Sequence, residues 1–198
     1  MLLPVRYQIT GRLLNMKNFK LIYVLLTAVF FISCGDIYDK IDFGVTPAAA
    51  GRFSHTMILK TDGSLLAAGM NGSGQLGDGT ITTQYSPVQV MTDVISVFGS
   101  ADHSMALKSD GTLWAAGDNS SGQFGDGTTT GSTTFKQVTS GVKAVSCGTT
   151  HSMILMKDGN LMAAGDNALG QFGDGTTTDS TTFKQVASDI KAVSCGNA

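Results

Sequence analysis

The chain has 198 residues, of which 42% are hydrophobic and 14% are charged, and its formal net charge is −2. This length and composition suit a globular domain rather than a disordered chain. From Gly35 onward nine basic residues accompany 15 aspartates and no glutamate, a net charge of −6 that argues against a nucleic-acid partner and against a helical protein.

Residues 1–34 have the pattern of an export signal. Lys17 and Lys20 precede an uncharged apolar run at 21–32. This run is too short to cross about 30 Å of hydrocarbon as a helix, but it has the length of a signal-peptide core. We expect translation to begin at Met16, which leaves residues 1–15 as a misassigned start.

The apolar run ends at a cysteine. Ile32-Ser33-Cys34 resembles a bacterial lipobox, in which the cysteine is lipidated and becomes the new N-terminus, although Phe31 stands where leucine is usual. The resemblance implies lipid attachment at Cys34, and residues 35–50 would then form a tether to the membrane. We therefore expect an exported, membrane-anchored bacterial lipoprotein, periplasmic or on the cell surface. The alternative is an ordinary signal peptide or an uncleaved anchor, with Cys34 incidental.

From residue 51 to residue 198 the chain repeats itself. Units of equal length begin at His55, His103 and His151 and align without a gap. A fixed period of 20 to 50 residues is typical of a solenoid or a propeller, in which each unit buries its apolar face only against its neighbours. The sequence therefore predicts a repeat architecture for residues 51–198.

One unit contains four short extended segments. In the unit that begins at His103, side chains alternate up to Lys108 with the period of two that a strand requires. Asp110-Gly111 then predicts a two-residue hairpin with a type I′ turn, because glycine accepts a positive φ. The four predicted strands are residues 103–108, 113–116, 135–138 and 142–147, with a glycine-rich loop at 117–130. Four strands in about 48 residues match one propeller blade.

Two recurring motifs resemble those of the regulator of chromosome condensation repeat family. The first is VSCGTTHSMIL at residues 145–155. The second is Gly-Gln-Leu/Phe-Gly-Asp-Gly-Thr, at residues 74–80, 122–128 and 170–176. The first motif departs from the pattern in two units, where Gly51 and Gly99 lie four residues before the histidine instead of three.

The resemblance implies a seven-bladed β-propeller. Three repeats of this length are too few to close one, so we expect an all-β partial propeller of three four-stranded repeats, as a fragment of a longer chain. If the chain is complete, its open blade edges are expected to self-associate, because unpaired strands bind other strands.

Three patterns invite a cofactor or metal interpretation. Residues 72–77 spell G-x-G-x-x-G, but no helical pattern follows and the sister repeats lack the first glycine, so we predict a turn. The three histidines recur at one position without carboxylate or cysteine at ligand spacing, which favours a buried structural role. Asp118, Asn119 and Asp126 lack the alternating spacing of a calcium loop and suit turns. We predict no cofactor and no metal.

No residue pattern predicts catalysis. Ser104 and Ser152 follow histidines, but neighbouring residues of a strand point to opposite faces. Each candidate acid recurs in every repeat, as structural residues do, and Trp114 is expected in the core. Cys147 and Cys195 occupy equivalent positions in consecutive units and are expected as buried, unpaired thiols. We predict that the protein is not an enzyme.

The predicted function is protein–protein binding, because rigid propeller blades carry variable loops. The expected partners are another protein and, through the lipid, the membrane. One alternative is guanine-nucleotide exchange on a small GTPase, which the export signal and the acidic composition oppose. The other is a propeller enzyme or a carbohydrate-binding module, which would be marked by one repeat with residues that its sisters lack.

Overall fold

The structure, a computed structural model, describes residues 8–9, 12–13, 49–50 and 55–196. The chain forms two compact units, residues 1–43 and 44–198. The first unit holds a two-stranded antiparallel sheet of β1 (Gln8–Ile9) and β2 (Arg12–Leu13). The apolar core of the signal and Cys34 lie outside the described residues, so export and lipid attachment stay predictions. Within the described ranges no helix is long and apolar enough to span a bilayer.

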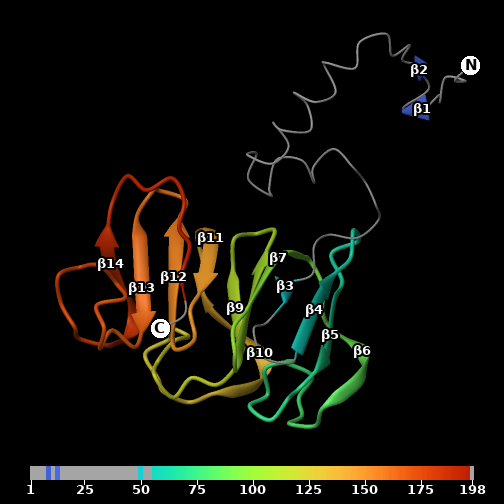
Figure 1. Cartoon of the computed structure of the whole chain (residues 1–198), viewed down its shortest axis with the longest axis horizontal. Helices are drawn as coiled ribbons and strands as arrows, with labels where there is room; N and C mark the ends of the chain where they lie inside the picture. Colours follow the sequence, from blue (N-terminus) through green and yellow to red (C-terminus); the bar gives the residue numbers. More distant parts are fainter. Residues whose placement is uncertain (1–7, 10–11, 14–48, 51–54, 197–198) are drawn as a thin grey trace, which may run out of the picture. The chain divides into compact units, whose positions relative to one another are not determined.

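Three four-stranded antiparallel sheets make up the second unit (Figure 1), and we call them blades one to three. Blade one comprises β3 (Ala49–Ala50), β4 (His55–Leu59), β5 (Leu65–Gly69) and β6 (Gln84–Met91). Blade two comprises β7 (Val94–Gly99), β8 (His103–Lys108), β9 (Leu113–Gly117) and β10 (Ser132–Thr139). Blade three comprises β11 (Val142–Cys147), β12 (His151–Met156), β13 (Leu161–Gly165) and β14 (Ser180–Ala187). The prediction of an all-β chain with three four-stranded repeats is confirmed.

The blades do not coincide with the sequence repeats that begin at the histidines. Each blade begins one strand earlier in the chain than the repeat that contains its histidine. β7 precedes His103 in the chain and pairs with β8, so the segment 142–147, which ends the unit of His103, is the first strand of the next blade. The chain therefore passes from one blade to the next within the units that begin at His55 and His103. Residues 190–195 nearly repeat the sequence of 142–147, yet they form no strand, because they pair with no strand among the described residues.

The hairpin turn differs in type from the predicted one. Gly111 has a positive φ of 86°, but Asp110 does not. The Gly111 amide donates to the Lys108 carbonyl at 2.9 Å and the Lys108 amide to the Thr112 carbonyl at 3.0 Å, which makes a three-residue loop of a type I turn followed by a left-handed glycine. The Asp110 carboxylate accepts the Thr112 amide at 2.8 Å, an Asx turn that needs no left-handed aspartate. The prediction of a type I′ turn is therefore wrong.

The apolar cores lie between neighbouring blades. Residues 103–107 of β8 and residues 151–155 of β12 are all buried, whereas β4 of blade one alternates between buried and more exposed residues. One core joins blades one and two, and a second joins blades two and three. The buried members include Met57, Leu65, Ala106 and Phe135 in the first core, and Met105, Leu113, Val145 and Ile154 in the second. Each blade thus depends on its neighbour for burial.

A phenylalanine of each following blade packs onto a glycine of the blade before it. A Cβ at Gly77 would overlap the ring of Phe135 of β10, and a Cβ at Gly125 would overlap the ring of Phe183 of β14. Gly173, the equivalent glycine of blade three, has nothing within 4 Å of a Cβ. The contact between glycine and phenylalanine therefore forms only where a following blade lies against the loop.

This arrangement predicts different costs for one substitution at two equivalent glycines. Gly125 and Gly173 have φ values of 69° and 68°, so an alanine meets the same backbone strain at both positions. G125A must also displace the ring of Phe183, which should lower the free energy of unfolding by a further ~1–3 kcal/mol. Urea denaturation of both variants measures the difference. Equal costs would contradict a tight packing of the ring on Gly125.

Candidate functional site

A hydrogen bond between histidine and serine links each blade to the next. Nε2 of His55 lies 3.0 Å from Oγ of Ser104, and Nε2 of His103 lies 3.2 Å from Oγ of Ser152. Each serine bonds the histidine 49 residues before it and not its own neighbour in the strand. Ser104 and Ser152 are fully buried, at 0% exposure. Since no substrate reaches these hydroxyls, the pairs hold blades together and do not act as nucleophile and base.

Burial lowers the pKa of two of the three histidines, His103 and His151. Removal from water lowers the pKa of His103 to about 4, against the opposing charge of Asp118. Burial also lowers the pKa of His151, opposed by Asp166. The three histidines belong to three different blades, and the part of the chain that the structure describes contains no group of three metal-ligating side chains. All three histidines are buried, and this burial together with the hydrogen bonds of His55 and His103 fits the predicted structural role.

One buried asparagine organises the long loop of each blade. Oδ1 of the fully buried Asn119 accepts the Phe124 amide at 2.8 Å. Its Nδ2 donates to the carbonyl oxygens of Thr128 at 3.0 Å and Thr130 at 3.3 Å. The corresponding residues of the other blades are Asn71 and Asn167. The G-x-G-x-x-G pattern lies in this loop with no helix after it, so the prediction of a turn is confirmed.

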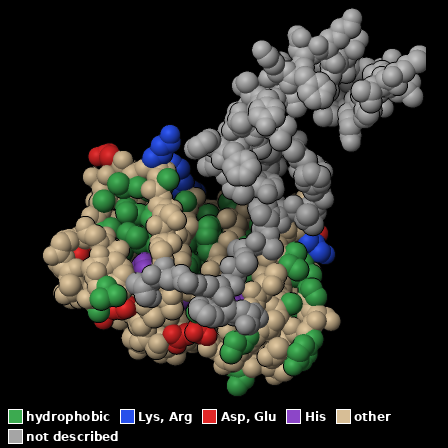
Figure 2. All heavy atoms as spheres, viewed as in Figure 1, with side chains coloured by type: hydrophobic (Ala, Val, Ile, Leu, Met, Phe, Trp, Pro, Cys, Tyr) green, Lys and Arg blue, Asp and Glu red, His purple; other side chains and the backbone are tan. Residues whose placement is uncertain are grey.

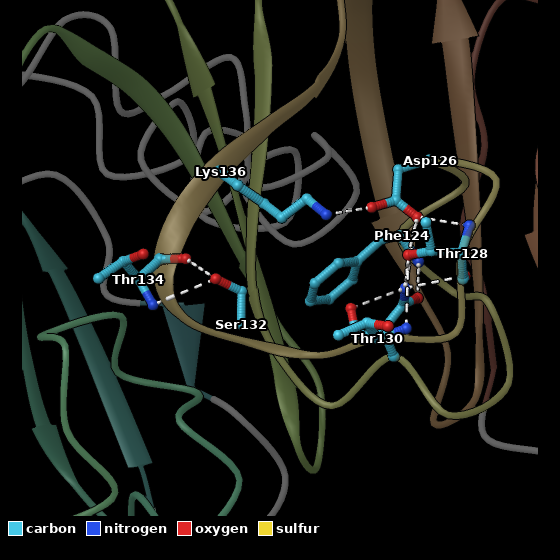
Figure 3. A network of polar contacts seen from close by, with 8 residues as sticks. Phe124, Asp126, Thr128, Thr130, Ser132, Thr134 and Lys136 are labelled. Atoms are coloured by element: carbon cyan, nitrogen blue, oxygen red, sulfur yellow. Dashed lines mark hydrogen bonds and ion pairs between the residues drawn. The ribbon is translucent and has the colours of Figure 1, made fainter.

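The aspartate of the loop motif belongs to the same network, which Figure 3 shows for blade two. Oδ1 of Asp126 accepts the amide and the hydroxyl of Thr128 at 3.0 and 2.8 Å, and the carboxylate forms an ion pair with Lys136 of β10. Burial raises the pKa of Asp126, but Lys136 and Thr128 more than offset this and hold the pKa below its usual value. Beside them, the Ser132 hydroxyl donates to the Thr134 carbonyl at 2.6 Å. Because the Asp126 carboxylate already bonds Thr128 and Lys136, it suits a structural turn better than a calcium site.

Two models of the Regulator of chromosome condensation (RCC1) repeat match the sequence. One matches residues 62–107 and 110–155, and the other matches 48–75, 94–123 and 142–171. Together they span residues 48–171, which is more than half of the chain and includes all three histidines and all three loop asparagines. The chain belongs to the RCC1 repeat family.

Solved structures share the fold of these RCC1 repeats. Human WBSCR16 matches with a TM-score of 0.64 at 25% identity, over 75% of this chain and 39% of that chain. Prp20p from Saccharomyces cerevisiae matches with a TM-score of 0.67 at 22% identity, over 78% and 42%. Yeast RCC1 (Prp20) bound to Kap60 gives 0.64 at 21% identity, over 77% and 40%. The chain thus spans about two fifths of the length of these structures. A search of the curated proteins finds no match.

The first RCC1 repeat lacks a polar contact that its sisters have. In blade two Nε2 of Gln123 donates to Asp118 at 2.9 Å, and blade three has the same pair. Met70 stands at the position of that aspartate in blade one, and Nε2 of the fully buried Gln75 has no hydrogen-bond partner among the residues that the structure describes. A buried unpaired amide group costs about 1–3 kcal/mol. Met70 therefore weakens the loop that it belongs to.

Blade one also carries exposed apolar side chains where its sisters carry threonine. Ile81 (65% exposed) stands where blade two has the exposed Thr129, and Tyr85 (95%) stands where blade two has Thr133, which is half-buried against Gly74 of the preceding blade. With Met70 (47%) they form what we call the apolar set of blade one. Figure 2 shows hydrophobic side chains among uncharged polar ones at the surface, with acidic side chains only in small groups. The sequence prediction missed this set because it compared the repeats for shared motifs, whereas the gapless alignment shows the three differences.

The remaining candidate residues have structural positions. Trp114 packs half-buried against the core between blades one and two, and its Nε1 donates to the Thr112 hydroxyl at 2.9 Å. Cys147 ends β11 and Cys195 lies outside any strand, and both thiols are free and partly buried. Burial raises the pKa of the Cys147 thiol to about 12, which keeps it protonated at neutral pH.

The buried histidine predicts a pH-dependent stability. The folded-state pKa of His103, about 4, lies below the ordinary value of 6.5, so the free energy of unfolding should fall by up to about 3 kcal/mol as the pH drops from 6.5 to 4. The loop aspartates have lowered pKa values and contribute mainly below this window. H103Q removes the titration, so the slope of unfolding free energy against pH, measured with urea, should decrease. An unchanged slope would contradict a buried, neutral His103.

Restoring the aspartate of the sister repeats should stabilise blade one. M70D gives Nε2 of Gln75 the acceptor that Asp118 gives Gln123, and we expect a gain of about 1 kcal/mol in the free energy of unfolding. M70A is the matched control, because it removes the methionine without supplying an acceptor. The prediction fails if M70D and M70A unfold at the same urea concentration.

Proposed function

We propose that this chain is a non-enzymatic protein-binding module whose contact surface includes the apolar set of blade one. The observation that carries the proposal is Met70. It leaves Nε2 of Gln75 unpaired and exposes a thioether side chain where the sister repeats place a stabilising carboxylate. A residue that lowers stability and also exposes apolar surface is typical of a binding site.

The loop that carries the apolar set is held in one conformation. Nδ2 of the buried Asn71 donates to the carbonyl oxygens of Thr80 at 3.0 Å and Thr82 at 3.2 Å, on either side of Ile81. Nε2 of Gln84 also donates to Asp78 at 2.8 Å across the same loop. An ordered loop loses little conformational entropy when it binds a partner. This supports binding through Ile81 from a preformed surface.

The comparisons support protein binding only as a class of function. Binding to Gsp1p and histones is described for Prp20p, to which this chain is 22% identical over less than half of that protein. We do not extend nucleotide exchange to this chain on that basis. A second copy of the chain is also a candidate partner, and sedimentation of the full chain distinguishes self-association from binding of a different protein.

We also propose that the module is exported and held at a bacterial membrane by a lipid on Cys34. The apolar run 21–32 and the lipobox-like Ile32-Ser33-Cys34 support this proposal. A chain labelled in bacterial cells with an alkyne fatty acid should carry the label, and C34A should lose it. Equal labelling of both chains would overturn the anchor and leave the protein-binding proposal in place.

Site-specific photo-crosslinking tests the binding surface. A photo-reactive amino acid replaces Ile81, Thr129 or Thr177, which occupy the same exposed loop position in the three blades. We expect a crosslinked partner from position 81 and roughly tenfold less from the other two positions, because few interface residues carry most of the binding. The variant M70D/I81T/Y85T, which restores the residue types of the sisters, should lose the partner. Equal crosslinking from all three blades would contradict a surface on blade one.

A further inference from the structure

A depression lies between blades one and two at the end of the β4–β5 hairpin. Its volume is ≈ 370 Å³. It is lined by residues 59–63, residues 93–95 and Ser109. The hairpin and the long loop lie at opposite ends of β5, so this depression is separate from the apolar set. We call it the hairpin depression.

The chain itself fills the equivalent space between blades two and three. Lys157 occupies the position of Ser109 one repeat later. The backbone hydrogen bonds are also equivalent, since the Ser109 amide donates to the Asp93 carbonyl and the Lys157 amide donates to the Gly141 carbonyl. A Cβ at Gly111 would lie 2.5 Å from Nζ of Lys157 and 3.0 Å from its Cε, so this lysine side chain lies against Gly111.

Among the described residues, no side chain lies as close to Gly63 as Lys157 lies to Gly111. The nearest atoms to a Cβ at Gly63 are backbone atoms of Asp93 and Val94, at 3.4 to 3.5 Å. Gly63 is half-buried, whereas its equivalent Gly111 is buried under Lys157. Ser109 is too short to cover Gly63, and the space that a lysine fills in the sister interface is open here.

The rim of the hairpin depression also differs from that of its sister. Asp93 replaces Gly141 and adds a carboxylate, and Ile95, 56% exposed, replaces Lys143 and adds an apolar wall. The charged residues that line the hairpin depression are Lys60, Asp62 and Asp93, a net charge of −1. Those at the equivalent positions of the sister are Lys108, Asp110, Lys143 and Lys157, a net charge of +2. Of these two equivalent places, the hairpin depression is the one that combines open space with an excess of negative charge.

We propose that the hairpin depression binds an alkylammonium group, of the kind that a lysine side chain presents. The methylene chain lies along Ile95 and over Gly63, as the stem of Lys157 lies over Gly111, and the ammonium is balanced by the carboxylates of Asp62 and Asp93. The ligand is either a lysine of a partner protein or a free primary amine. The proposal does not depend on the apolar set, which lies at the other end of the blade.

The test uses the full chain, labelled with 15N, and three probes: pentylammonium, the uncharged 1-pentanol, and N-acetyl-lysine N-methylamide. Pentylammonium should shift the amide resonances of Gly63, Val94 and Ser109 in a saturable way at low salt, and 1-pentanol should shift them at least about tenfold more weakly. Binding of the lysine derivative as well points to a partner protein, and binding of the free amine alone points to a small-molecule ligand. Equal shifts with pentylammonium and 1-pentanol would overturn the proposal.

Two matched variants separate binding from folding. S109K places a lysine where Lys157 lies in the sister interface, so the chain should stay folded and lose at least about tenfold in affinity for pentylammonium. D93N keeps a residue that accepts the left-handed φ of 64° and should lose roughly three- to fivefold. K157S opens the sister depression without adding a carboxylate and should gain no binding there. Unchanged affinity in a folded S109K, or equal binding at the sister site of K157S, would refute the assignment.

Discussion

Each blade of this RCC1-repeat chain is held by the face of the next blade, and the other features of the structure depend on that contact. A histidine bonds a serine 49 residues later, and a phenylalanine ring packs on a loop glycine of the preceding blade. The loop backbone joins the same interface, where the Gly127 amide donates to the Thr181 carbonyl at 2.8 Å. A motif within one repeat, such as the histidine or the loop glycine, therefore supplies only one side of a contact between two blades. The other side lies in the following repeat, as expected for an array in which units bury surface only against their neighbours.

The repeats carry information about function where they differ. Met70 replaces an aspartate that bonds the loop glutamine in both sister repeats, and Ser109 stands where Lys157 covers a glycine one repeat later. As a result, Gln75 has no acceptor among the described residues, and Gly63 has no covering side chain among them. Each change exposes a side chain or opens space at the surface. A local departure such as Met70, at a position where both sister repeats have aspartate, is expected at a functional position.

The sequence was sufficient for the strands and insufficient for the contacts between them. Residues 142–147 could be predicted as a strand because alternation and the neighbouring turns lie within one unit. The bond from His103 to Ser152 could not, because its partners meet only after two blades stack with a shift of one strand. The turn at Asp110 was misread because its side chain bonds the backbone locally. Residues 190–195 show the reverse case, since a strand-like sequence without a pairing partner does not become a strand.

The offset of one strand between sequence repeat and blade has a consequence for the evolution of such chains. The units that begin at His55 and His103 each contribute strands to two blades, so duplication of such a unit adds one complete blade wherever the breakpoint falls within the period. The duplicated blade forms an interface with the blade on each side, and both interfaces are of a kind that the chain already contains. Recombination between units therefore preserves the alignment of the repeats. A duplicated blade is therefore folded from the start, and its exposed positions are free to diverge. Blade one, with the apolar set in and beside its long loop, has the features of such a diverged copy.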